Sequence, residues 1–180
     1  MVSKNKKNLS LRALEPSDID FLFDIENDTN LWKYSNRSTP YSKHLLLDYI
    51  KNSSKDIFES RQIKFAIADS KNVPLGFIDL YDFEPIHRRA AIGLVVDYSY
   101  RSTGIGSVSL DLIEIYAKKQ LFLNQLYANI AAENKPSINL FKKHKFIETG
   151  KKVKWNFYDE NFHDEYIFQK IILVKKYFLQ

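Results

Sequence analysis

The stretch Val95-Val-Asp-Tyr-Ser-Tyr-Arg-Ser-Thr-Gly-Ile-Gly-Ser107 decides the fold, because it joins an apolar strand to a long amphipathic segment. It contains Gly104 and Gly106, two of the five glycines in the chain. Glycines there permit a tight turn that gathers backbone N–H groups, and a helix start adds partial positive charge. The stretch therefore suits a phosphate or pyrophosphate, although a plain tight turn explains its glycines equally well. It matches neither a Walker loop nor a three-glycine dinucleotide fingerprint.

Outward from this stretch, the hydrophobic periodicity predicts a mixed α/β (α+β) fold. Two successive hairpins before it predict antiparallel pairing, and a strand–helix–strand unit after it predicts one parallel pair. The expected strands cover 9–14, 63–68, 75–81, 90–97 and 125–130, with a last hairpin of 146–157 and 166–174 around a polar turn at 159–161. The expected helices start at Pro16-Ser17 and cover 42–52, 105–121 and 135–144.

Length and composition limit the class of protein. The 180 residues suit one domain, 9–180, preceded by a flexible basic tail at 1–8. With no cysteine, the chain cannot form disulfides, thiolate nucleophiles or Cys-ligated zinc sites. No stretch approaches the roughly 20 apolar residues of a membrane helix, and the start lacks an apolar signal core. We therefore expect a cytoplasmic protein that does not bind membranes.

The net charge of +5 is unevenly distributed. Residues 142–154 contain six lysines and one glutamate, whereas 14–32 contain six acidic residues and no lysine or arginine. The lysine stretch raises the alternative of nucleic-acid binding. Only six of the 27 basic residues are arginine, and no base-reading helix or stacking motif is evident, so we expect no nucleic-acid partner. The acidic segment instead favours a cationic ligand.

Several motifs, in order, resemble the GNAT superfamily of N-acetyltransferases. Arg101-Ser-Thr-Gly-Ile-Gly106 is similar to its Arg/Gln-x-x-Gly-x-Gly/Ala signature, and 9–20 resembles its opening strand and helix. Glu26-Asn-Asp-Thr-Asn-Leu-Trp32 resembles a stretch of the branch that holds spermidine acetyltransferase and ribosomal-protein N-terminal acetyltransferases. Residues 134–146 resemble the family's Asn-x-x-Ser-x-x-Leu-Tyr-x-x-x-Gly-Phe element.

The resemblance implies a GNAT-like, mostly antiparallel sheet of about seven strands, with helices on both faces and a central splay that holds acetyl-CoA. It implies that Leu94, Val95 and Val96 pair with the pantetheine arm, and that Asn134 reaches this arm or the thioester. The pyrophosphate would be held by N–H groups of Arg101, Ser102, Thr103, Gly104, Ile105, Gly106 and Ser107. The remaining expected cofactor contacts are Asn139, Phe141 and Lys143, with Lys142 and Lys143 toward the adenosine phosphate. No metal is expected, since His163-Asp-Glu165 falls in a polar turn without a second histidine at helical spacing.

Two usual catalytic groups of the family are missing. Many members have a tyrosine acid where this chain has Phe141, and a glutamate base where it has Ala91. An alkyl ammonium must lose a proton before it attacks a thioester, so another base is needed. The candidates are Glu26, ranked first, with Asp79 and Glu84, and Tyr81 and His87 lie nearby in the sequence. We predict Glu26 and Asn134 as the catalytic residues.

The implied function is transfer of an acetyl group from acetyl-CoA to a primary amine by direct attack in a ternary complex. The acceptor would be a polyamine, an amino sugar or a peptide N-terminus, selected by the loop 28–43. The main alternative is an acetyl-CoA-binding sensor that has lost transfer activity. The aromatic residues Trp32, Tyr34, Trp155, Phe157 and Tyr158 are expected mostly in the core, with a few lining the acceptor pocket. A homodimer that pairs through the last hairpin is possible.

Overall fold

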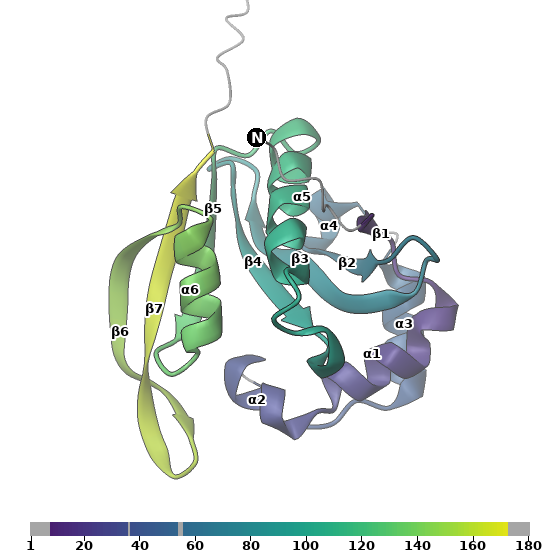
Figure 1. Ribbon diagram of the computed structural model, residues 1–180, viewed down its shortest axis with the longest axis horizontal. Helices are drawn as coiled ribbons and strands as arrows, with labels where there is room; N and C mark the ends of the chain where they lie inside the picture. Colours follow the sequence, from purple (N-terminus) through teal and green to yellow (C-terminus); the bar gives the residue numbers. More distant parts are fainter. Residues whose placement is uncertain (1–7, 36, 54–55, 173–180) are drawn as a thin grey trace, which may run out of the picture.

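The computed structural model describes residues 8–35, 37–53 and 56–172, and its ribbon is drawn in Figure 1. Residues 1–7 of the predicted tail lie outside the described residues, as do Leu173 and Val174 of the last expected strand. Among the helices of the described ranges, none combines the length and the apolar character that crossing a bilayer requires.

Seven strands of the described chain form one mixed sheet. Their order is β1-β2-β3-β4-β5-β7-β6, and every neighbouring pair is antiparallel except β4 with β5. The strands are β1 (Ser10–Arg12), β2 (Ile63–Ala68), β3 (Pro74–Glu84), β4 (Arg89–Val96), β5 (Gln125–Ala131), β6 (Ile147–Tyr158) and β7 (Asn161–Ile171). This arrangement confirms the predicted mostly antiparallel sheet with one parallel crossover.

The parallel pairing of β4 with β5 is short. It runs only from Arg89↔Gln125 to Ala91↔Tyr127, although β4 continues to Val96 and β5 to Ala131. Figure 1 shows the two strands diverging beyond this point. The predicted central splay is therefore present, and it leaves the last residues of β4 without a strand partner on that side.

Helices cover both faces of the sheet, as expected. On one face, α5 (Ile105–Lys119) and α6 (Lys135–Lys143) pack with the larger hydrophobic cluster. On the other face, α1 (Ile19–Glu26) and α3 (Lys43–Asn52) form a second cluster. Successive side chains of β2 point to opposite faces of the sheet and so contribute to both clusters. Phe65 and Ile67 belong to the larger cluster, and Ala66 belongs to the second one.

Two short helices were not expected from the sequence. The helix α2 (Thr29–Ser35) lies within the stretch 28–43 that we predicted to be a loop, and α4 (Ile57–Ser60) precedes β2. The α2 helix begins where the Asp28 side chain accepts a hydrogen bond from the Asn30 N–H at 2.9 Å. Trp32 fixes it by donating from Nε1 to the Glu26 carbonyl at 3.0 Å. Short helices of this kind depend on such local contacts rather than on periodicity.

The last hairpin differs from the prediction in where its second strand begins. β7 starts at Asn161 rather than Tyr166, because Asp159 and Glu160 alone make the turn, with φ of 48° and 59°. Positive φ at both residues is typical of a two-residue hairpin turn that matches the twist of the strands. His163-Asp-Glu165 therefore lies in a strand and not in a polar turn, which corrects that expectation.

Candidate active site

The glycine loop has the backbone geometry of an anion-binding helix start. Gly104 has φ of +88° and forms the N-cap of the 15-residue helix α5. A Cβ at this position would meet nothing within 4 Å, so the backbone there faces open space. The Arg101 side chain holds the loop against the end of β4 by donating from Nε to the Val96 carbonyl at 3.1 Å. The first N–H groups of a helix have no partner within it, so this helix start suits a pyrophosphate.

Helix α6 packs directly against this loop. A Cβ added to Gly106 would lie 3.1 Å from Leu140 Cδ2, so glycine allows the close approach of the two helices. Ser107 Oγ is 2.7 Å from His144 Nε2, just beyond the end of α6. Burial lowers the pKa of His144, which favours the neutral ring. Residues from 101–107 and from 134–144 are therefore brought together, as the resemblance implies.

The outer part of β4 offers a free backbone edge beside the loop. Leu94, Val95 and Val96 pair with β3 on one side and are only partly buried, since the pairing with β5 has already ended. An extended ligand can add to such an edge through main-chain hydrogen bonds. These three residues and the loop form one continuous surface for a ligand with a pyrophosphate and a long arm.

The expected contacts on α6 differ in their surroundings. Asn134 is the N-cap, whose Oδ1 accepts from the Ser137 N–H at 3.2 Å, and its amide nitrogen makes no hydrogen bond to the described part of the chain. Asn139 and Lys143 are exposed on the helix surface. Phe141 is buried, with its ring centroid 4.9 Å from that of Phe146, so it packs in the core. Lys142 forms an ion pair with Glu148, with 3.7 Å between Nζ and Oε2.

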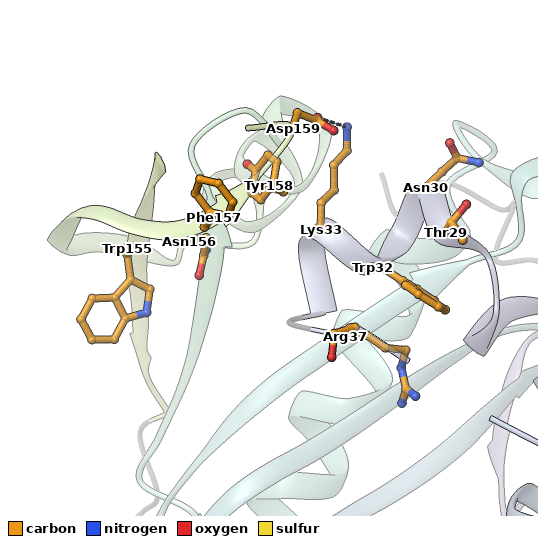
Figure 2. Close-up of a pocket in the computed structure, with 11 residues that line it drawn as sticks. Thr29, Asn30, Trp32, Lys33, Arg37, Trp155, Asn156, Phe157, Tyr158 and Asp159 are labelled. Carbon is orange, nitrogen blue, oxygen red and sulfur yellow. Dashed lines mark ion pairs between the residues drawn. The ribbon is translucent and has the colours of Figure 1, made fainter. Parts of the chain in front are cut away.

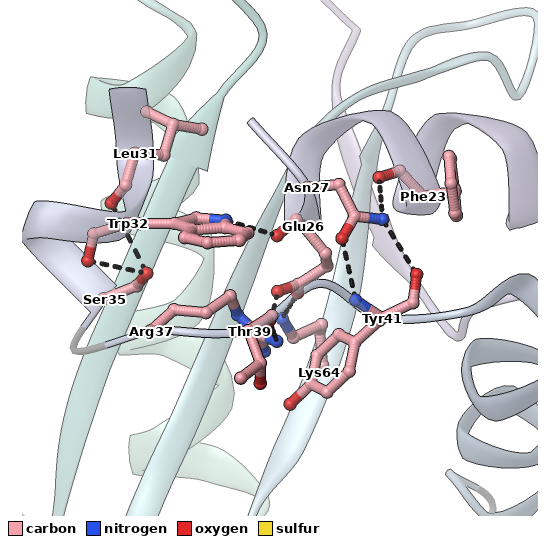
Figure 3. A network of polar contacts seen from close by, with 10 residues as sticks. All are labelled: Phe23, Glu26, Asn27, Leu31, Trp32, Ser35, Arg37, Thr39, Tyr41 and Lys64. Carbon is pink, nitrogen blue, oxygen red and sulfur yellow. Dashed lines mark hydrogen bonds and ion pairs between the residues drawn. The ribbon is translucent and has the colours of Figure 1, made fainter. Parts of the chain in front are cut away.

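Glu26 lies on the opposite face of the sheet in an ion-pair network (Figure 3). Its Oε1 accepts from Lys64 Nζ at 2.7 Å, and its Oε2 is 3.4 Å from Arg37 Nη2. Sequence reasoning missed both cations, because Lys64 belongs to β2 and Arg37 to the stretch after α2. Burial lowers the pKa of Lys64, but Asp79 and Glu26 outweigh it, so that this pKa lies above its usual value.

Asp79 is the acid nearest to the splay among the three predicted candidates. It pairs with Gly93 in the β3–β4 ladder, and a Cβ on Gly93 would lie 2.4 Å from Asp79 Oδ1. The carboxyl group therefore rests directly on Gly93, next to Leu94. Burial raises the pKa of Asp79, Lys64 opposes this shift and Glu26 adds to it. Glu84 is exposed at the far end of β3, and the structure does not bring it to this group.

A second group of polar side chains, separate from the ion-pair network of Glu26, lies on β5, β6 and β7. Lys152 Nζ is 2.8 Å from Oε2 of the buried Glu165 and 3.3 Å from Asn129 Oδ1. Asn156 donates to Glu165 Oε1 at 3.2 Å. This group could not be predicted from the sequence, because its members come together only through the register of the three strands.

A cavity of about 490 Å³ opens between α2 and the β6–β7 hairpin (Figure 2). It is lined by aromatic, polar and charged side chains: Thr29, Asn30, Trp32, Lys33, Arg37, Ser38, Trp155, Asn156, Phe157, Tyr158 and Asp159. Tyr34, Trp155 and Phe157 are exposed by 43%, 60% and 65%, so the expectation that these aromatics lie in the core is wrong. Arg37 links this cavity to Glu26, and Asn156 links it to Glu165.

The chain resembles known acetyltransferases in sequence. Residues 8–147 match the family model described as an acetyltransferase (GNAT) domain. A spermidine N(1)-acetyltransferase of Vibrio cholerae is 26% identical over 169 residues, which cover 94% of this chain and 95% of that protein. A putative phosphinothricin acetyltransferase of Bacillus subtilis is 27% identical, with 79% and 86% covered.

Solved structures share the fold. The crystal structure of the Vibrio cholerae spermidine N-acetyltransferase in complex with CoA and spermine superposes with a TM-score of 0.83 at 24% identity, covering 91% of this chain and 95% of that one. The same enzyme in a dodecameric intermediate state gives a TM-score of 0.74. Together with the loop, the splay and the family match, these findings place the chain in the GNAT acetyltransferase family, as an acetyl-CoA-dependent N-acetyltransferase.

Proposed function

We propose that the protein transfers the acetyl group of acetyl-CoA to a primary amine of a polyamine such as spermidine. The observation that carries this proposal is the Asp79 carboxyl group resting on Gly93, beside the backbone edge where the thioester is expected. Glu26 and Glu165 lie on the same side of the sheet, and carboxylates suit a ligand with several ammonium groups. The relatives named as spermidine acetyltransferases support the same acceptor class.

The proposed binding of acetyl-CoA follows the surfaces described above. The N–H groups of 101–107 hold the pyrophosphate, Leu94 to Val96 pair with the pantetheine arm, and Asn134 contacts this arm with its amide. Asn139 and Lys143 lie on the exposed side of α6, where the adenosine end reaches solvent. Phe141 contributes apolar packing only, since it has no proton to donate.

We assign separate roles to the two acids nearest the reaction. Glu26 is already paired with Lys64 and Arg37, so we propose that it orients the acceptor's ammonium group within this network. Asp79 then removes a proton from the ammonium group, and this loss makes the amine a nucleophile. The pKa of Asp79 is raised, which brings it closer to the pKa of the ammonium group. The amine nitrogen attacks the thioester carbon, the C–S bond breaks, and CoA leaves as a thiolate. Positioning of both substrates supplies much of the rate enhancement.

Purified protein should release CoA thiol from acetyl-CoA when spermidine is added, in a saturable manner. An amino sugar and a short peptide with a free N-terminus serve as competing acceptors. If kcat/KM is larger for the peptide or for the amino sugar than for spermidine, the proposed acceptor would be that compound and not a polyamine. Acetyl-CoA binding without thiol release on any of them would favour the alternative of a sensor, which the missing groups at Phe141 and Ala91 suggest.

The contacts of the lysine stretch 142–154 argue against the alternative of nucleic-acid binding. Lys142, Lys151 and Lys152 each pair with an acidic side chain, at 3.7, 2.6 and 2.8 Å respectively. These partners neutralise half of the six lysines before any phosphate approaches. Binding to a duplex that falls steeply with added salt would restore this alternative.

We also propose a homo-oligomer and a cytoplasmic site of action. Val153, Trp155 and Phe157 of the edge strand β6 are exposed by 60–66%, a larger apolar edge than a free strand usually carries. A second copy covering it agrees with the assembly of the dodecameric relative. Light scattering of the purified chain tests the oligomer. The lack of cysteine fits a reducing compartment.

A further inference from the structure

Tyr81 lies where β4 and β5 separate. It is opposite Ala91 in the β3–β4 ladder, and Ala91 pairs in turn with Tyr127 at the last step of the β4–β5 ladder. Against the larger raising effect of burial, the nearby Asn129 side chain of β5 lowers the pKa of the Tyr81 hydroxyl. Since β4 lies between β3 and β5, the phenol must cross it, over a span of about 10 Å between the outer strands. It crosses at Ala91, whose methyl group leaves room that a glutamate would fill.

This crossing point is where the thiol end of CoA is expected. The pyrophosphate loop follows the open end of β4, and an arm that pairs with Val96 and then Leu94 runs back toward Ala91. The β4–β5 pairing closes the splay at Ala91 and Tyr127, so the arm can go no deeper between the strands. The sulfur therefore comes to lie beside the Tyr81 hydroxyl.

Asn129 orients this hydroxyl. Its Oδ1 already accepts from Lys152 Nζ at 3.3 Å, and Lys152 is held by the buried Glu165 at 2.8 Å. This leaves the amide nitrogen of Asn129 toward the nearby phenol oxygen, to which it can donate. With the amide of Asn129 toward the phenol oxygen, the phenol proton can point into the splay.

The groups around Tyr81 keep it protonated. Burial raises its pKa most, and the nearby Asp79, Tyr127 and Asp82 raise it further. A phenol that stays neutral is a poor source of a transferred proton but a dependable hydrogen-bond donor. The neighbouring Tyr127 is engaged elsewhere, because its hydroxyl donates to Asp82 Oδ2 at 3.3 Å.

We propose that Tyr81 is a catalytic residue that donates a hydrogen bond to the departing sulfur, in place of the acid missing at Phe141. As the N–C bond forms and the C–S bond breaks, the electron pair of that bond goes to sulfur, and the Tyr81 O–H stabilises the thiolate. The attacking nitrogen loses its surplus proton to solvent, because Asp79 already holds the first one, and the thiolate takes its own proton from solvent. Tyr81 itself ends the step unchanged. This inference rests on the proposed transfer reaction.

The first test compares Tyr81→Phe with Tyr127→Phe in the full-length protein. Tyr81→Phe keeps the ring and removes only the hydroxyl, so we expect kcat to fall about 10- to 100-fold with the KM for acetyl-CoA within twofold of wild type. Tyr127→Phe removes a neighbouring hydroxyl that faces Asp82, and its kcat should stay within twofold. Equal losses in both variants, or no loss in Tyr81→Phe, would overturn the assignment.

A binding measurement tests the contact without requiring turnover. Calorimetric titrations compare CoA with desulfo-CoA, which lacks the thiol, over a pH series that extends above the pKa of the CoA thiol, where CoA binds as its thiolate. Wild type should prefer CoA, and Tyr81→Phe should reduce that preference about three- to tenfold, as the loss of one hydrogen bond predicts. An unchanged preference refutes the contact. A wild type that binds CoA but acetylates no amine refutes the proposed function instead, and the titrations still decide the role of Tyr81.

Discussion

Replacement of Gly93 by alanine should displace the proposed base without touching its chemistry. The new Cβ would lie 2.4 Å from Asp79 Oδ1 and 2.9 Å from its Cγ, whereas ordinary contacts begin near 3.4 Å. The carboxyl group must therefore retreat by about 1 Å, which its flexible side chain permits. A displacement of about 1 Å at a reacting group costs roughly 10²-fold in rate. Overpacking of this size costs about 1–3 kcal/mol of folding stability.

Steady-state thiol release, with acetyl-CoA and spermidine varied in turn, measures this effect. We expect kcat for Gly93→Ala to fall about 100-fold. The matched control is Gly150→Ala on β6, where the added Cβ would meet Ile167 Cδ1 at an ordinary 3.6 Å, and its activity should be unchanged. Thermal unfolding of both variants separates loss of activity from loss of structure.

A double variant tests whether Gly93 acts through Asp79. Asp79→Asn removes the base but keeps the clash, so adding Gly93→Ala to it should lower kcat little further, although stability still falls. Losses in kcat that multiply instead would show that Gly93 acts independently of Asp79. Wild-type kcat in Gly93→Ala would refute the placement of the base altogether.

Three further predictions concern other parts of the molecule. Because burial raises the pKa of Asp79, kcat/KM should fall on acidification at a pH above 3.8, the ordinary pKa of an aspartate, and Asp79→Asn should abolish this fall in a pH–rate profile. Gly104→Val places a branched side chain at φ of +88°, at a cost of about 1–2 kcal/mol, so calorimetry should record roughly tenfold weaker acetyl-CoA binding. The hydrogen bond to Glu133 raises the pKa of His163 above 6.5 and helps to lower that of Glu133 against burial. This pair should stabilise the fold fully between the lowered pKa of Glu133 and pH 6.5, and the stabilisation should be lost as pH rises through the raised pKa of His163. The Tm difference between wild type and His163→Gln should therefore shrink as pH rises through that pKa.

The parts of the fold that local patterns encode were predictable from the sequence. The glycine loop, α5 and α6 follow from the run of 95–107 and from the strand–helix–strand pattern after it, whereas the splay was expected from the resemblance to the family. The helix α2 was missed because it is held by single contacts of Asp28 and Trp32, which have no periodic signature. The start of β7 was missed because Asp159-Glu160 is an unusual pair for a two-residue turn, in which Asn-Gly is favoured.

The catalytic surroundings were less predictable, for a different reason. Asp79 was among the candidates from its sequence position, but its contact with Gly93 depends on the β3–β4 register. Lys64 meets Glu26 across 38 residues of chain, and Tyr81 meets Asn129 across an intervening strand. A shift of one residue in any of these registers would turn the side chains to the other face. Such groups are found only once the pairing of the strands is known.

The central claim is that this chain moves an acetyl group from acetyl-CoA to a polyamine. The most direct measurement is the release of CoA thiol from acetyl-CoA in the presence of spermidine, with mass analysis of the amine. Thiol release should be saturable, should require both the protein and the amine, and should yield a singly acetylated product. Tight binding of acetyl-CoA with neither thiol release nor an acetylated amine would contradict it.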